Sequence, residues 1–181
     1  MFDPVRSEAS PDATPLDPRA LQVLLPCARV LAADPDGFVD LLHQHLVALV
    51  PDAAAASAQA GLAVCDRVAR AALAAATGER PVTEVAALLQ QAGVDNFRDG
   101  FPAEQYLAVG HALLRAAHEA YPAQWSTELG SAWIAYFVWV RTHLLRGGAT
   151  ALAVDWARAD GEAVRHRTAG VTGPPDGPRS G

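Results

Sequence analysis

Three residues at helical spacing are the first candidates for chemistry in this chain. His111, Arg115 and His118 are separated by four and then three residues, which places their side chains on one face of a helix. Two histidines at such spacing can bind a metal ion, but an arginine between them would repel a cation. We therefore interpret the group as a polar surface or an interface, with metal binding as the alternative.

Nucleophilic chemistry has one weak candidate. Cys65 is followed by Asp66, but no histidine lies in helical register to activate the thiol, and both Cys65 and Cys27 are more typical of buried small side chains. The sequence has no glycine-rich phosphate loop, nucleophile elbow, paired-cysteine metal knuckle or His-Glu-x-x-His helix. We predict no catalytic residue and no metal ligand.

The composition predicts an all-α domain in a reducing compartment. Apolar residues make up 51% of the 181 positions, alanine is abundant, and charged residues make up 19%. A net charge of −6 and arginines scattered along the chain argue against nucleic-acid and anionic-membrane partners. Two cysteines, no signal peptide and no apolar run of about 20 residues lead us to expect a soluble, cytoplasmic protein.

Helix signals divide the chain into one domain and two tails. We expect flexible tails at residues 1–16 and 168–181, and a domain over 17–167 that includes an extra C-terminal helix at 150–167. Asp17, Thr83 and Ser126 are the expected helix caps. The expected helices are 18–33, a second ending near Pro51, the alanine-rich run ending at Gly78, 83–93, 102–121, a sixth ending at Gly147 and Gly148, and 150–167.

Three stretches carry a resemblance to a known family. GFPAEQYLAVGHALL is followed by a helix containing SAWIAYF, and LLHQHLVALVPDA stands further upstream. In this order and spacing they resemble the globin family, closest to the globin domain of bacterial flavohemoglobins, over roughly residues 17–147. The resemblance implies a globin-like fold of six to seven helices. No flavin or nicotinamide domain is expected after residue 181, so any electron donor would be another protein.

The positions that hold heme in that family are altered here. The proximal histidine stands ten residues before the family's Tyr, which corresponds to Tyr106, and that count arrives at Asn96. An amide is a poor ligand for heme iron compared with an imidazole. The family's heme-packing Phe falls on Ser57, and no aromatic residue lies between Phe38 and Phe97.

Two functional hypotheses follow from these departures. The first is a globin-family domain that has lost heme and acts as a heme-free sensor or protein-interaction module. The alternative is a heme-binding globin that handles oxygen or nitric oxide through a non-standard ligand such as His43, which occupies the position of the family's distal Tyr. By resemblance, the pocket positions are His43, Asn96 and Tyr106, and Tyr106 is expected to pack in the core.

The position of Trp139 on its helix predicts a homodimer. Trp139 lies about 100° from the centre of the apolar stripe of its helix, so we expect it to be partly exposed on a monomer. Globin-type sensors commonly pair through their last two long helices, and we therefore expect a homodimer around Trp139, with His111 or His118 nearby. The alternative is that residues 150–167 fold back and cover Trp139.

Overall fold

Six α-helices and one short 3-10 helix form the part of the chain that the structure, a computed structural model, describes: residues 16–50 and 58–169, with side chains over 16–50 and 61–160. This confirms the predicted all-α class and globin-like fold. Ser57, part of the third predicted helix and most of both predicted tails lie outside the described residues. The helices are α1 (Pro18–Ala33), α2 (Pro35–Leu49), α4 (Ala58–Ala76), α5 (Val82–Arg98), η1 (Ala103–Gln105), α6 (Tyr106–Ala120) and α7 (Thr127–Ala169).

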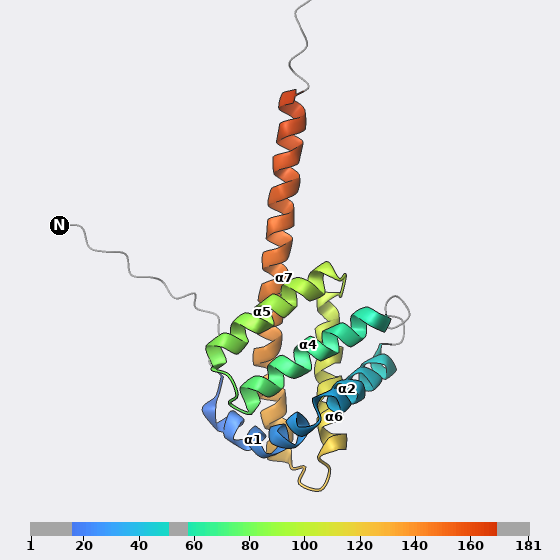
Figure 1. Ribbon diagram of the computed structural model, residues 1–181, viewed down its shortest axis with the longest axis vertical. Helices are drawn as coiled ribbons and strands as arrows, with labels where there is room; N and C mark the ends of the chain where they lie inside the picture. Colours follow the sequence, from blue (N-terminus) through green and yellow to red (C-terminus); the bar gives the residue numbers. More distant parts are fainter. Residues whose placement is uncertain (1–15, 51–57, 170–181) are drawn as a thin grey trace, which may run out of the picture.

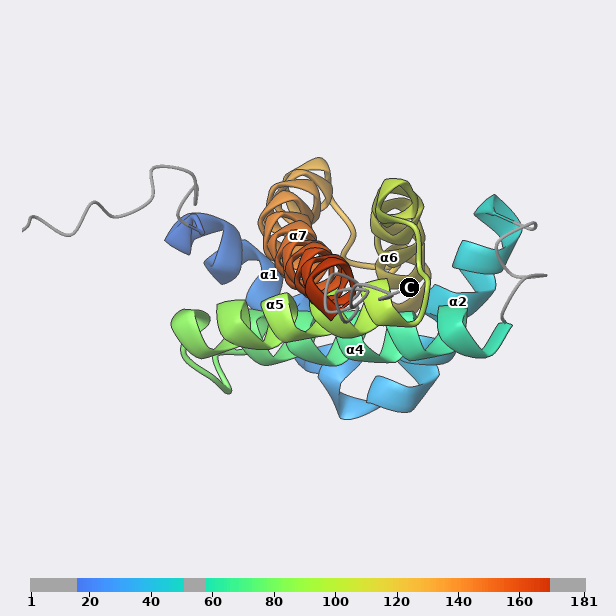
Figure 2. The same ribbon diagram turned by 90° about the horizontal axis from the view of Figure 1, so that it is seen from above.

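The helices pack in layers around one core. Helices α4 and α5 lie side by side, with α6 and α7 across one of their faces and α2 beside α4 and α6 (Figures 1 and 2). The inner side chains are small over most of α4, where Val64, Val68 and a run of alanines are buried. Large side chains concentrate on α7, where Trp133 and Tyr136 are completely buried and the Tyr136 hydroxyl donates to the Ala72 carbonyl at 2.6 Å.

Two predicted caps are confirmed and one is wrong. Asp17 Oδ1 accepts from the Arg19 amide at 2.9 Å, and Ser126 Oγ accepts from the Leu129 amide at 3.1 Å. Thr83 does not cap α5, which begins at Val82 behind Pro81 and has no side-chain cap. Proline supplies the extended backbone that precedes this helix, so the start moves one residue earlier.

Three glycines that were predicted to end helices, Gly93, Gly147 and Gly148, lie inside them. Helix α5 continues through Gly93 to Arg98, and α7 continues through Gly147. A Cβ at Gly93 would collide with the Leu144 carbonyl, and one at Gly147 would collide with the Gln90 carbonyl. Gly93 and Gly147 therefore let the backbones of α5 and α7 touch where they cross, which is a packing role and not a helix stop.

The predicted separate helix at 150–167 is the end of α7. This helix rises as a rod beyond the rest of the domain (Figure 1), and every side chain from Leu152 to Asp160 is exposed. Residues 168 and 169, predicted to belong to the tail, are helical. In the described part of the chain, no helix is long and apolar enough to cross a membrane.

Trp139 is buried within one chain, contrary to our expectation. Its side chain is 7% exposed and stacks on Tyr136 at a centroid distance of 5.9 Å. Leu16, just before α1, and Ala20, in its first turn, line a small hollow together with Trp139. Trp139 thus packs on Tyr136 and His143 of its own helix and borders this hollow, while residues 150–167 continue α7 outward and do not fold back over it.

Candidate functional site: a buried polar chain at Asn96

The C-terminal end of α5 holds two polar residues on the same face. The Phe101 amide donates to the Asn96 carbonyl at 2.9 Å, and the Gly100 amide donates to the Phe97 carbonyl at 3.0 Å. With Gly100 at a φ of 77°, this is a Schellman motif, which closes the helix through a left-handed glycine. Asn96 and Asp99 stand three residues apart in this last turn and so project toward the same neighbour.

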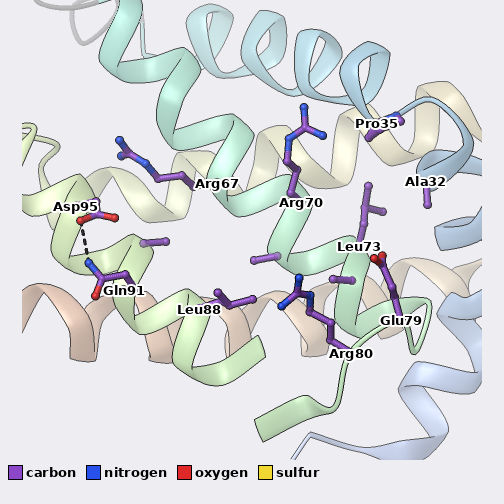
Figure 3. A pocket seen from close by; sticks show the side chains of 13 residues that line it. Ala32, Pro35, Arg67, Arg70, Leu73, Glu79, Arg80, Leu88, Gln91 and Asp95 are labelled. Carbon is purple, nitrogen blue, oxygen red and sulfur yellow. Dashed lines mark hydrogen bonds between the residues drawn. The ribbon is translucent and has the colours of Figure 1, made fainter. Parts of the chain in front are cut away.

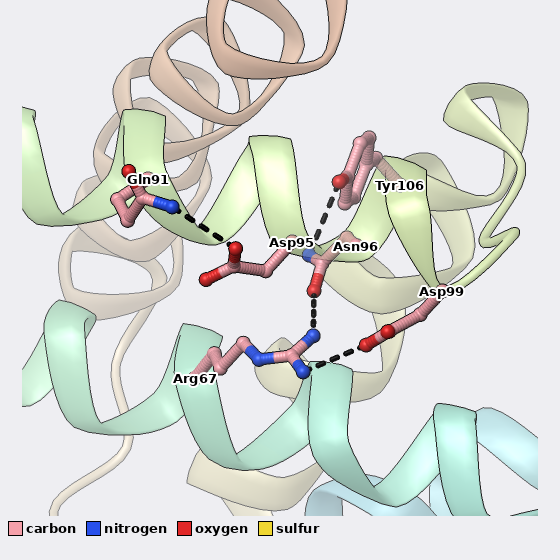
Figure 4. A network of polar contacts seen from close by, with 6 residues as sticks. All are labelled: Arg67, Gln91, Asp95, Asn96, Asp99 and Tyr106. Carbon is pink, nitrogen blue, oxygen red and sulfur yellow. Dashed lines mark hydrogen bonds and ion pairs between the residues drawn. The ribbon is translucent and has the colours of Figure 1, made fainter. Parts of the chain in front are cut away.

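That neighbour is Arg67 of α4. Its Nη1 donates to Asn96 Oδ1 at 2.7 Å, and its Nη2 donates to Asp99 Oδ2 at 2.7 Å. Figure 4 shows the guanidinium standing between α4 and α5 and facing both side chains. One arginine thereby ties two helices together with two charge-assisted hydrogen bonds, which are stronger than bonds between neutral groups.

Asn96 extends the chain of contacts to α6. Its Nδ2 donates to the Tyr106 hydroxyl at 3.1 Å, and its side chain is 0% exposed. Burial raises the pKa of Tyr106, while the hydrogen bond from Asn96 and the charge of Arg67 act in the opposite direction. The Tyr106 phenol therefore stays protonated at neutral pH. Asn96 thus connects the charged Arg67 guanidinium to the neutral Tyr106 hydroxyl.

The arrangement does not fit a heme iron at Asn96. Both polar atoms of the amide already have partners, and the nearest group across the gap to α4 is a positively charged guanidinium. An iron ligand needs a free lone pair directed at open space, and a cation beside it opposes metal binding. The Asn96 side chain thus has a structural role, because it links Arg67 of α4 to Tyr106 of α6.

His43 lies on α2 and its ring faces α4. A Cβ placed on Gly61 would lie 3.6 Å from His43 Nε2, so the imidazole reaches the α4 backbone closely. Its Nε2 is buried and has no hydrogen-bond partner among the described residues. Among the described residues, His43 Nε2 has no hydrogen bond to Asn96 or Tyr106, so the predicted pocket positions divide into a linked pair, Asn96 with Tyr106, and a separate histidine.

A hollow of about 500 Å³ opens between α4 and α5, beside the hydrogen-bonded residues Arg67, Asn96 and Tyr106. Figure 3 shows three arginines around it, at positions 67, 70 and 80. Arg67 is held by Asp99, and Arg70 is held by Asp66 and Asp36 at 2.6 Å each. Because these carboxylates already neutralise two of the three cations, the hollow is not a strong anion site.

The other residues considered as candidates for chemistry, the group His111, Arg115 and His118 and the thiol of Cys65, lie in surroundings that do not support metal binding or nucleophilic attack. His111, Arg115 and His118 are exposed, and His118 packs edge-on against Trp125 at a centroid distance of 4.9 Å. No group of three or more potential metal ligands occurs among the described residues. Burial raises the pKa of Cys65 to about 12, which opposes formation of the nucleophilic thiolate.

No protein-family model matches this chain, and no curated protein matches it significantly. The fold and the side-chain geometry are therefore the basis for assigning a function.

Sequence reasoning missed Arg67, the residue that organises the site. It lies 29 positions from Asn96, on a helix otherwise rich in small side chains. The one local signal is that a long charged residue interrupts the pattern of buried Val64, Val68 and Ala71. Such an interruption is also typical of a solvated helix face, so it does not identify the partner.

Proposed function

We propose that this domain is a heme-free, globin-like sensor or protein-interaction module. The observation that carries the proposal is the buried chain Arg67–Asn96–Tyr106, which uses the proximal position to link three helices. A domain that retained heme chemistry would need that position for an iron ligand, and the alanine-rich inner face of α4 offers no aromatic ring to pack against a porphyrin.

The alternative function, oxygen or nitric oxide handling through heme held by His43, has one favourable observation. His43 Nε2 has no partner within the described residues and is chemically able to bind iron. Its close approach to Gly61 opposes this role, because a metal and a porphyrin would have to enter where the ring meets the α4 backbone. We therefore favour the heme-free function.

A module without its own chemistry acts through a partner, and we propose that one partner is a second copy. The last long helix remains the surface for this homodimer, but its centre cannot be the buried Trp139. Within the part of α7 whose side chains are described, the large exposed apolar side chains are Ile134, Val138, Leu152, Val154 and Trp156. Hemin titration tests the heme-free assignment, and sedimentation tests the association, so the two parts can fail separately.

A further inference from the structure

The outer face of α7 carries an apolar stripe that runs from the domain into its projecting end. Ile134 and Val138 are each 57% exposed, Leu152 is 46% exposed and Trp156 is 65% exposed. At about 100° per residue, these four and the half-buried Leu145 share one face; Leu145 also packs against the core and, with Leu152, borders a hollow lined by Phe97 and Phe101. The stripe is about 33 Å long at the rise of an α-helix.

The projecting end of α7 lacks the packing that normally stabilises a helix. Every side chain from Leu152 to Asp160 is exposed, so this segment receives little help from the domain. Helices without tertiary contacts are marginal in water at such lengths, because most helical stability comes from packing an apolar face. A partner laid along the stripe would supply that packing.

We propose that the partner is a second copy of this chain, laid antiparallel so that Trp156 of each copy packs on Ile134 and Val138 of the other. This deepens the proposed homodimer and rests on it. The five stripe residues are spaced by 4, 7, 7 and 4 positions, a pattern that is the same in both directions. A twofold axis near residues 145–147 therefore matches each apolar side chain with another, as a self-complementary interface requires.

Charges beside the stripe favour the antiparallel direction. Arg141 is half-buried, and its Nε has no hydrogen-bond partner in the described part of the chain. The antiparallel arrangement brings Arg141 within reach of Asp155 of the other copy. A parallel, in-register pair would instead place Arg141 beside Arg141 and Asp155 beside Asp155, so like charges would face each other. Within one chain, Asp155 has only a 3.9 Å ion pair with Arg158, and both side chains are largely exposed.

Sedimentation velocity on the intact chain tests the surface. The parent should be a dimer, and Trp156→Ala should weaken it by about tenfold or more, because large buried aromatic rings dominate such interfaces. Val154→Ala is the matched control: Val154 is 41% exposed on the same segment but faces the opposite side of α7, so its removal should leave the dimer unchanged. A monomeric parent, or equal effects of the two variants, would overturn the proposal.

Cysteine cross-linking tests the direction. The native Cys27 and Cys65 are buried, so single cysteines introduced on the stripe report on it. A mixture of Val138→Cys and Leu152→Cys chains should form a disulfide between unlike copies, since the antiparallel register brings these positions together. Leu152→Cys alone should stay unlinked; efficient linking of that variant to itself would mean parallel pairing and reject the proposal. Neither outcome depends on heme binding.

Discussion

Arg67 Nη1 lies 2.7 Å from Asn96 Oδ1, so an arginine from α4 is hydrogen-bonded to a fully buried amide on α5. Both α5 and α4 contribute to this contact. The Schellman turn at Gly100 fixes Asn96 and Asp99 on one face of α5, and the guanidinium has donors enough to bond both. Tyr106 then completes the chain from α6.

Removing the amide should destabilise the domain. Asn96→Ala leaves the Tyr106 hydroxyl and one Arg67 donor without their partner, and we expect the free energy of unfolding to fall by about 2–4 kcal/mol in urea denaturation. Asn96→Asp is the control, because a carboxylate can accept from both Arg67 and Tyr106 and should lose less stability. If Asn96→Ala were as stable as the parent, the chain of contacts would have no structural role.

Adjacent glycines of α7 should respond in opposite ways to the same substitution. Gly147→Ala forces a methyl group into the Gln90 carbonyl, and we expect a loss of roughly 1–3 kcal/mol or more because backbone cannot move aside easily. At Gly148 the nearest atom to an added Cβ is 3.8 Å away, so Gly148→Ala should be neutral or stabilise the helix by up to about 1 kcal/mol. Thermal or urea unfolding distinguishes the two, and equal losses would contradict the close crossing.

Mild acid should weaken the fold through His143. Burial, and to a lesser extent the charge of Arg146, lowers the pKa of this histidine, whose ring lies near Gln90 and against Trp139. The unfolded chain therefore binds more protons as the pH falls below about 6.5, and the stability contributed by neutral His143 is lost in that range. His143→Gln should reduce the difference in urea midpoint between pH 7.5 and 5.5; an unchanged difference would assign it to other groups.

The sequence was sufficient for the helices whose caps are local. Asp17 and Ser126 each bond an amide two or three residues away, so their signals are contained in a few letters. Gly93 and Gly147 were misread because glycine weakens a helix and also permits two helices to touch. The structure distinguishes a helix end from a helix contact, because a Cβ on Gly93 would collide with the Leu144 carbonyl.

The candidate site was half predictable for the same reason. Asn96 and Tyr106 were expected as pocket positions from the resemblance to globins, and they are in contact, but Arg67 comes from another helix and no sequence pattern links it to them. Trp139 was misplaced because its position on α7 was judged from that helix alone. The hollow shared with Leu16 and Ala20 shows the start of the domain packing where solvent was expected.

Hemin titration followed by absorption spectroscopy tests the central claim most directly. The parent chain should show no stoichiometric Soret band, because Asn96 is saturated by Arg67 and Tyr106. Asn96→His should gain little heme affinity while Arg67 still stands beside position 96, and His43→Ala serves as the control for the alternative ligand. A tight one-to-one complex of the parent with a Soret band, abolished by His43→Ala, would contradict the heme-free function and establish the alternative.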